Sequence, residues 1–258
     1  MDSVEKEDDI MTTTLKNTAK TGSTFNMTIF KFALIKGLRS PGTFIFNCVI
    51  PIALILIRPL WTGDVFISGF GLLIMVIWGG AFLMSQGIIN DRQEGALTRI
   101  LSAPISMRNY LVQNLLAFMV PLSAQIVLVT VLGAVLYGWS LSLALLVFLC
   151  YTVFTISAVA MSFAWNCLFK SKDGAFSSFS VMVTFGTFLS GALIPIEAFP
   201  EGILQYIGAV LPAYWAVRAL NTLSAAELTI TAEYWTSILA LALFTIAFLL
   251  YGGKRRLI

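Results

Sequence analysis

The residues best placed to do chemistry lie in a charged stretch at positions 90–109, NDRQEGALTRILSAPISMRN, between two long apolar runs. Carboxylates and guanidinium groups alternate there with aliphatic side chains. This mixture suits recognition of a partner through ion pairs and apolar contacts. Because apolar runs flank the charged stretch on both sides, we expect it to lie in water, outside a membrane.

The start of the charged stretch predicts a helix N-terminus. Asp91 can accept a hydrogen bond as the N-cap, and Glu94, three residues later, can reach back to the backbone as in a capping box. Pro104 sets the other limit, because it lacks a backbone N–H and disfavours helix in the residue before it. We therefore expect a short helix that ends near Ala103.

The aliphatic residues of this short helix are predicted to share one face. Leu97, Ile100 and Leu101 recur at helical spacing, while Arg99 points elsewhere. Such an amphipathic helix can be gripped by another protein or can lie on a lipid surface. A solvated loop without a partner is the remaining alternative.

Catalytic chemistry is disfavoured by the composition. The chain has no histidine, the commonest general base and metal ligand. Cys48, Cys150 and Cys167 lie singly within apolar runs, so neither a zinc site nor a disulfide framework is indicated. A phosphate loop is absent, because residues 37–43 have its glycine spacing but Thr43 where lysine is required. We expect no enzyme, no metal and no cofactor bound by this chain, with energy supplied by a partner or an ion gradient.

The overall composition indicates an integral membrane protein. Hydrophobic residues make up 58% and charged residues 11% of the 258 residues, and the mean hydropathy is +0.89. Six apolar runs are each about 30 Å long as a helix, enough to span a bilayer. We expect an all-α membrane protein with one transmembrane domain over 25–258 and spans at 42–60, 65–89, 110–137, 141–169, 175–194 and 234–251.

Three segments outside these runs differ from them in composition and are expected to form other kinds of structure. Residues 1–24 are polar and are expected to form a flexible cytoplasmic tail. Residues 25–39 mix apolar with basic side chains, which suits an interfacial helix, although they can also be the front of a long first span. Residues 199–220 are broken by prolines, and we expect an outer re-entrant helical hairpin packed against the spans or a second subunit.

The positions of lysine and arginine predict the orientation. With the N-terminus inside, all sixteen basic residues except Arg58 and Arg218 lie on the inner side. We therefore expect a multi-pass protein of the cell membrane, in contact with lipid, with both termini cytoplasmic.

Two motifs resemble those of a known family. Asp91-Arg92-Gln93-Glu94-Gly95-Ala96-Leu97, followed by Leu101 and Pro104, resembles the loop motif of type-2 ATP-binding-cassette (ABC) transporter permeases. The outer stretch is similar to the C-terminal signature of the same family, through Leu189-Ser190-Gly191, Pro195, Phe199-Pro200, Leu211-Pro212 and Arg218. The resemblance covers nearly the whole chain and departs at Ala96, where the family often has Thr.

This resemblance implies a permease half that forms a homodimer or heterodimer and sits on two ABC ATPase subunits, which bind ATP and Mg. No nucleic acid is expected as a partner. In the family, the loop with this motif contributes a coupling helix that docks in a groove of the ATPase. The coupling residues implied here are Asp91, Arg92, Glu94, Gly95, Leu97, Arg99, Ile100, Leu101 and Pro104.

The sequence offers a weaker prediction for a substrate pathway. Ser180, Thr184, Thr187 and Gly191 form a stripe of small and weakly polar residues in the fifth predicted span, and Asn47 and Gln125 are polar residues in two others. Close packing between helices explains the stripe at least as well, and hydrogen bonding between helices explains Asn47 and Gln125 equally well.

For function, we expect export of a drug, an antibiotic or another amphiphile, as in multidrug resistance. Export of a lipid-linked glycan or polysaccharide is the alternative within the family. A non-transporting membrane sensor or immunity protein is the alternative outside it.

Overall fold

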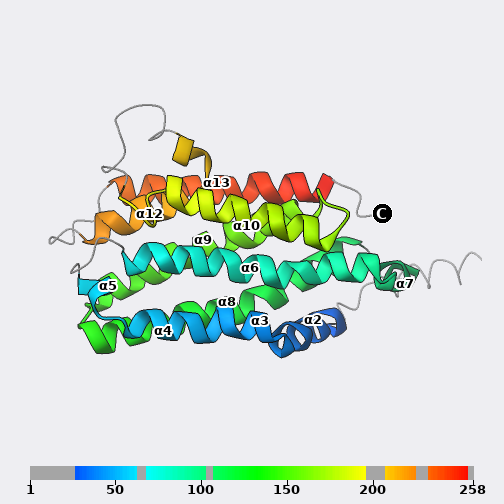
Figure 1. Ribbon diagram of the computed structural model, residues 1–258, viewed down its shortest axis with the longest axis horizontal. Helices are drawn as coiled ribbons and strands as arrows, with labels where there is room; N and C mark the ends of the chain where they lie inside the picture. The colour runs from blue at the N-terminus through cyan, green and yellow to red at the C-terminus, as the bar shows by residue number, and fades with distance from the viewer. Residues whose placement is uncertain (1–26, 63–67, 103–106, 196–206, 225–231, 255–258) are drawn as a thin grey trace, which may run out of the picture.

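The computed structural model describes residues 27–62, 68–102, 107–195, 207–224 and 232–254, and the regular elements within these ranges are all helices (Figure 1). The predicted tail over 1–24 lies outside them. An all-helical fold is what a bilayer requires of isolated spans, because a helix satisfies its backbone hydrogen bonds within one segment.

Four long helices form the body of the molecule. They are α6 (Gly69–Gln93), α8 (Met107–Tyr137), α9 (Leu141–Asn166) and α13 (Ala232–Lys254), and each is long and apolar enough to cross a membrane. The central helix is α9, which packs against α6, α8 and α13. These helices coincide with the predicted spans at 65–89, 110–137, 141–169 and 234–251.

The first predicted span, 42–60, is irregular. It consists of α3 (Pro41–Phe44), a π-helical turn η1 (Ile45–Val49), α4 (Ile50–Leu56) and α5 (Pro59–Thr62). Pro51 near the start of α4 has no backbone donor, so the regular hydrogen-bond pattern cannot run through this point, and a π-helical turn precedes it.

The helix before this span is sharply bent away from it. The segment from Pro41 to Leu56 makes an angle of 78° with α2 (Thr28–Arg39), and only the bent pair together reaches the length of a span. The two segments therefore form either one broken span or a separate helix followed by a short apolar segment, and both interpretations of residues 25–39 stay predictions.

The fifth predicted span, 175–194, corresponds to α10 (Lys172–Leu189), which packs against α6. It is not among the candidate spans of the structure, because Lys172, Asp173 and several serines and threonines lower its hydropathy. The described residues thus contain four candidate spans, or five with the bent pair, and the prediction of six is confirmed only in part.

The described part of the predicted outer hairpin, 199–220, contains η3 (Gly208–Val210) and α12 (Pro212–Ser224). Residues 196–206 lie outside the described ranges, so the hairpin as a whole is not tested. The helix α12 begins at the predicted proline break and packs against α13, α9 and α6, as expected for an element covered by protein.

An aromatic cluster closes the end of the body near α5. Trp61 lies 5.1 Å from Phe70 and 5.7 Å from Trp139 between ring centroids, and Tyr137 stacks on Trp61 at 6.2 Å. The Trp61 indole donates to the Leu54 carbonyl at 2.8 Å. Such rings, with an apolar body and a polar handle, are typical of membrane interfaces.

Close backbone contact holds the chain after α10 against α6. A Cβ atom at Gly71 would lie 1.8 Å from the Ala192 carbonyl oxygen, whereas one at Gly87 on the same helix would meet nothing within 4 Å. Glycine at position 71 is therefore required by packing.

We expect Gly71→Ala to destabilise the protein by about 1–3 kcal/mol, because the new methyl group must displace backbone. Gly87→Ala is the matched control, and it should be neutral or stabilise by up to about 1 kcal/mol through helix propensity. Thermal unfolding in detergent measures both. Equal stability of the two variants would contradict the close contact.

Candidate functional site

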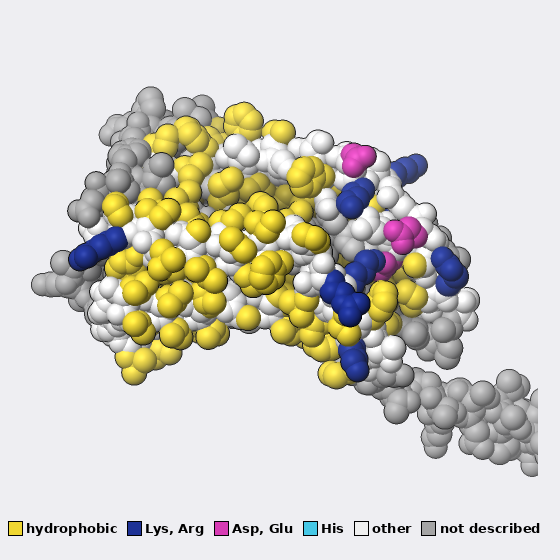
Figure 2. Space-filling model, turned by 60° about the horizontal axis from the view of Figure 1, so that its bottom comes forward, with side chains coloured by type: hydrophobic (Ala, Val, Ile, Leu, Met, Phe, Trp, Pro, Cys, Tyr) yellow, Lys and Arg dark blue, Asp and Glu magenta, His cyan; other side chains and the backbone are white. Residues whose placement is uncertain are grey.

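Lys, Arg, Asp and Glu side chains gather mainly at one end of the molecule, beside a broad hydrophobic surface (Figure 2). This end contains the last turn of α6, the short helix α7 (Ala96–Ser102), the helix α2, and the segment between α9 and α10. It contains the charged stretch singled out in the sequence.

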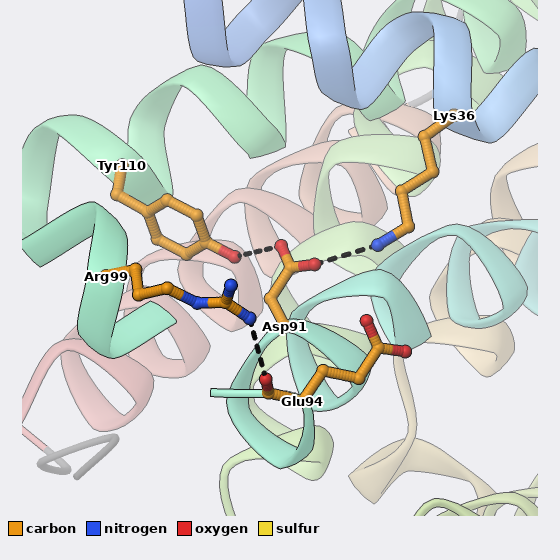
Figure 3. A network of polar contacts seen from close by, with 5 residues as sticks. All are labelled: Lys36, Asp91, Glu94, Arg99 and Tyr110. Atoms are coloured by element: carbon orange, nitrogen blue, oxygen red, sulfur yellow. Dashed lines mark hydrogen bonds and ion pairs between the residues drawn. The ribbon is translucent and has the colours of Figure 1, made fainter. Parts of the chain in front are cut away.

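Asp91 connects three helices at this end (Figure 3). One carboxylate oxygen accepts from Lys36 Nζ of α2 at 2.8 Å, and the other accepts from the Tyr110 hydroxyl of α8 at 2.7 Å. The Asp91 side chain is only 13% exposed. A partly buried carboxylate with two donors of this kind is strongly oriented.

This position corrects the predicted role of Asp91. It lies in the last turn of α6, which continues to Gln93, and Glu94 is the C-cap of the same helix. The predicted capping box is therefore wrong, because a capping box forms at a helix N-terminus and Asp91 and Glu94 lie at the C-terminus of α6. The apolar run of α6 continues into the charged stretch as one helix, so no new N-terminus arises at Asp91.

The break between α6 and α7 falls at Gly95, whose φ of +68° is unfavourable for residues with a Cβ. Arg99 folds back over this turn, and its guanidinium donates to the Glu94 carbonyl at 3.2 Å (Figure 3). The side chain of Arg99 thus satisfies a carbonyl at the end of α6 and stabilises the angle between the two helices.

Two further contacts join α6 to the segment after α9. Arg92 donates to the Phe169 carbonyl, and Gln93 Nε2 donates to the Lys170 carbonyl at 3.0 Å. The end of α6 is therefore bonded to α2, to α8 and to the α9–α10 connection.

The aliphatic face of α7 points inward. Leu97 is 3% exposed and belongs to the core of the protein, and Ile100 is half-buried against the same core. The prediction that Leu97 is available to a partner's groove is wrong, because its side chain is already packed within this chain. The side chain of Leu101 and the whole of Pro104 lie outside what the structure describes.

The exposed side chains at this tip are polar: Gln93, Glu94, Arg99 and Ser102. Of the residues that form the polar network, Lys36 and Tyr110 were not predicted as site residues. Their signals in the sequence were weak, since Lys36 is one of several basic residues of α2 and Tyr110 begins an apolar run.

The predicted pathway residues do not form one surface. Ser180 and Thr184 are exposed on α10, but Thr187 is buried and its hydroxyl donates to the Val183 carbonyl at 2.6 Å. Gly191 follows the end of α10 with a φ of +81°, so the helical stripe does not extend to it. Asn47 and Gln125 are 3% and 2% exposed, which places them inside the subunit.

No group of three or more His, Cys, Asp or Glu residues suited to a metal occurs within the described ranges. The charged end combines an internal network of hydrogen bonds with exposed polar side chains.

Comparison with protein families gives one match. Residues 41–253 match the family model described as ABC-2 family transporter protein. The matched range extends from α3 into α13 and covers most of the chain. A search of curated proteins finds no match.

A double-mutant cycle tests the Asp91 network. Asp91→Ala should lower the free energy of unfolding by about 1–3 kcal/mol, because it leaves the Tyr110 hydroxyl without its acceptor. We expect Asp91→Ala and Tyr110→Phe to couple by about 1 kcal/mol, and Asp91→Ala and Lys36→Ala by less, since Lys36 is more exposed to solvent. Denaturant unfolding in mixed micelles measures these energies, and strictly additive effects would contradict the network.

Proposed function

Because the chain belongs to the ABC-2 transporter family, whose membrane component has no ATPase activity of its own, we propose that it is an exporter permease driven through the α6–α7 tip. ATP hydrolysis lies in a partner subunit, and the chain is a multi-pass membrane protein. The observation that carries the proposal is the set of bonds from one exposed tip to several membrane helices.

The α6–α7 tip, meaning residues 91–102, is rigidly connected to the body. Asp91 bonds to α2 and α8, Arg92 bonds to the carbonyl of Phe169, and Leu97 is buried in the core. A force applied to the tip is thereby passed to several helices at once. Rigid-body movement of packed helices is an established way of switching between two states.

Docking of the ATPase on this tip is proposed to depend on charge. Glu94 and Gln93 are exposed beside Arg99, and these groups can pair with charges around a groove in the partner. The side chains of Leu97 and Ile100 pack against the core of the protein and hold α7 in place. We propose two ATPase copies on a dimer of permeases, made of identical or different chains.

The charge distribution supports a cytosolic position for the tip. Basic residues of the described ranges gather around it, namely Lys31, Lys36, Arg39, Arg92, Arg99, Lys170 and Lys172, whereas Arg58 and Arg218 belong to segments near the aromatic end. An excess of Lys and Arg is typical of cytoplasmic segments. Both termini would then be cytoplasmic.

The cargo we propose is a drug, an antibiotic or another amphiphile. The exposed face of α10 combines Ser180 and Thr184 with Phe185, a surface that suits a molecule with both apolar and weakly polar parts. Few charges occur in the candidate spans, which disfavours an ion-coupled carrier.

Charge reversal tests the docking role. Glu94→Lys should lower recovery of the ATPase by about tenfold, the effect of roughly 1.4 kcal/mol at the interface. Asp173→Lys is the control, because Asp173 is also an exposed acid but lies on α10 outside the tip. Copurification after mild detergent extraction measures both, and full recovery with Glu94→Lys would reject docking at the tip.

Labelling with a membrane-impermeant maleimide tests the orientation in a background without the three native cysteines. Ser102→Cys and Ser171→Cys should be protected in intact cells, whereas Val210→Cys of η3 should react. All three positions are exposed in the structure, so burial does not explain protection. The opposite pattern would place the tip outside and overturn the proposal.

A further inference from the structure

A cavity of about 650 Å³ lies beside the tip, between α2, α6, α7 and α8. This volume is within the range of sites for small organic ligands. The cavity has two kinds of wall. Its apolar wall includes Ile29, Phe32, Leu83, Met84 and Phe118, and its charged wall includes Lys36, Asp91, Glu94 and Lys172.

Gln86 gives the cavity a polar group of its own. It lines the cavity and is 7% exposed, and its Nε2 atom has no hydrogen-bond partner among the described residues. Buried donors of this kind are normally satisfied. Asn47 and Gln125 also have unpaired amides within the described ranges, but they do not line this cavity.

The cavity opens next to an apolar surface of α2. Phe32 lines the cavity and is 63% exposed, and Ile35 and Leu38 of the same helix are exposed as well. A helix with exposed apolar side chains and lysines, bent by 78° from the following segment, suits the headgroup layer of a bilayer. A helix of this kind in the headgroup layer would place the opening of the cavity beside lipid.

The charged wall of the cavity is balanced in charge. Lys36 and Asp91 neutralise each other through their ion pair at 2.8 Å. Lys172 and Glu94 remain as one exposed cation and one exposed anion. This combination matches a zwitterionic headgroup better than an anionic one.

We propose that this cavity binds one zwitterionic phospholipid from the leaflet at which α2 lies. An acyl chain packs against Phe32, Met84 and Phe118, while the phosphate and the ammonium group face Lys172 and Glu94. Gln86 lies eight residues before Glu94, about 12 Å along the helix. Its amide is therefore placed to donate to an ester carbonyl below the headgroup. This inference requires membrane residence but not the ATPase partner.

Filling the cavity tests the proposal. Gly87 lines the cavity, and a Cβ there meets nothing within 4 Å, so Gly87→Phe is chosen to place a ring in the cavity. Gly42→Phe is the matched control, because position 42 is equally open but does not line the cavity. Delipidated protein in detergent is mixed with phosphatidylethanolamine or phosphatidylglycerol, and retained lipid is counted by native mass spectrometry.

We expect the unmodified protein and Gly42→Phe to retain one phosphatidylethanolamine per chain, and Gly87→Phe to retain at least tenfold less. Gln86→Leu should weaken retention by about fivefold, the effect of one lost hydrogen bond. Glu94→Gln should reduce the preference for phosphatidylethanolamine over phosphatidylglycerol. Equal retention by Gly87→Phe and Gly42→Phe, or an unmodified protein that prefers phosphatidylglycerol, would overturn the proposal.

Discussion

One interaction holds together the end of the protein that we propose to face the cytosol. The Asp91 carboxylate accepts hydrogen bonds from both Lys36 and Tyr110. Its two oxygens bind donors from α2 and α8, elements that are 55 and 19 residues away along the chain. The Asp91 side chain is 13% exposed and that of Lys36 is 39% exposed, so the ion pair is partly screened by solvent, while the bond from the Tyr110 hydroxyl is better shielded. They join α2, α6 and α8 into one unit, to which the short helix α7 is attached.

The second constraint is the membrane itself, which forces the backbone into helices and makes each irregularity informative. A π-helical turn precedes Pro51 within the segment Pro41–Leu56, and a bend of 78° separates this segment from α2. The helix α6, by contrast, runs unbroken from the aromatic end to Gln93. A continuous helix can transmit a displacement from one end of the protein to the other, whereas a broken helix can bend at the break instead.

In the proposed mechanism, the small α6–α7 tip acts on the large apolar body of the protein. Among the side chains that the structure describes at the tip, Leu97 is packed in the core, and the exposed ones are polar. This division favours reversible docking guided by charge. The cavity beside the tip adds a lipid-accessible space to the same set of helices, so a bound phospholipid and a docked partner would contact a common framework.

The sequence by itself determined the helical membrane class, the approximate bounds of most long helices and the proline start of α12. These follow from local properties, since apolar run length, proline and glycine act over a few residues. Tertiary structure decided that Asp91 lies in the last turn of a helix and binds Lys36 and Tyr110, and that Leu97 faces inward. It also decided that Thr187 of the predicted α10 stripe is buried while Ser180 and Thr184 are exposed. Helical spacing shows which side chains share a face but not what that face contacts, because the contact is made by residues distant in the chain.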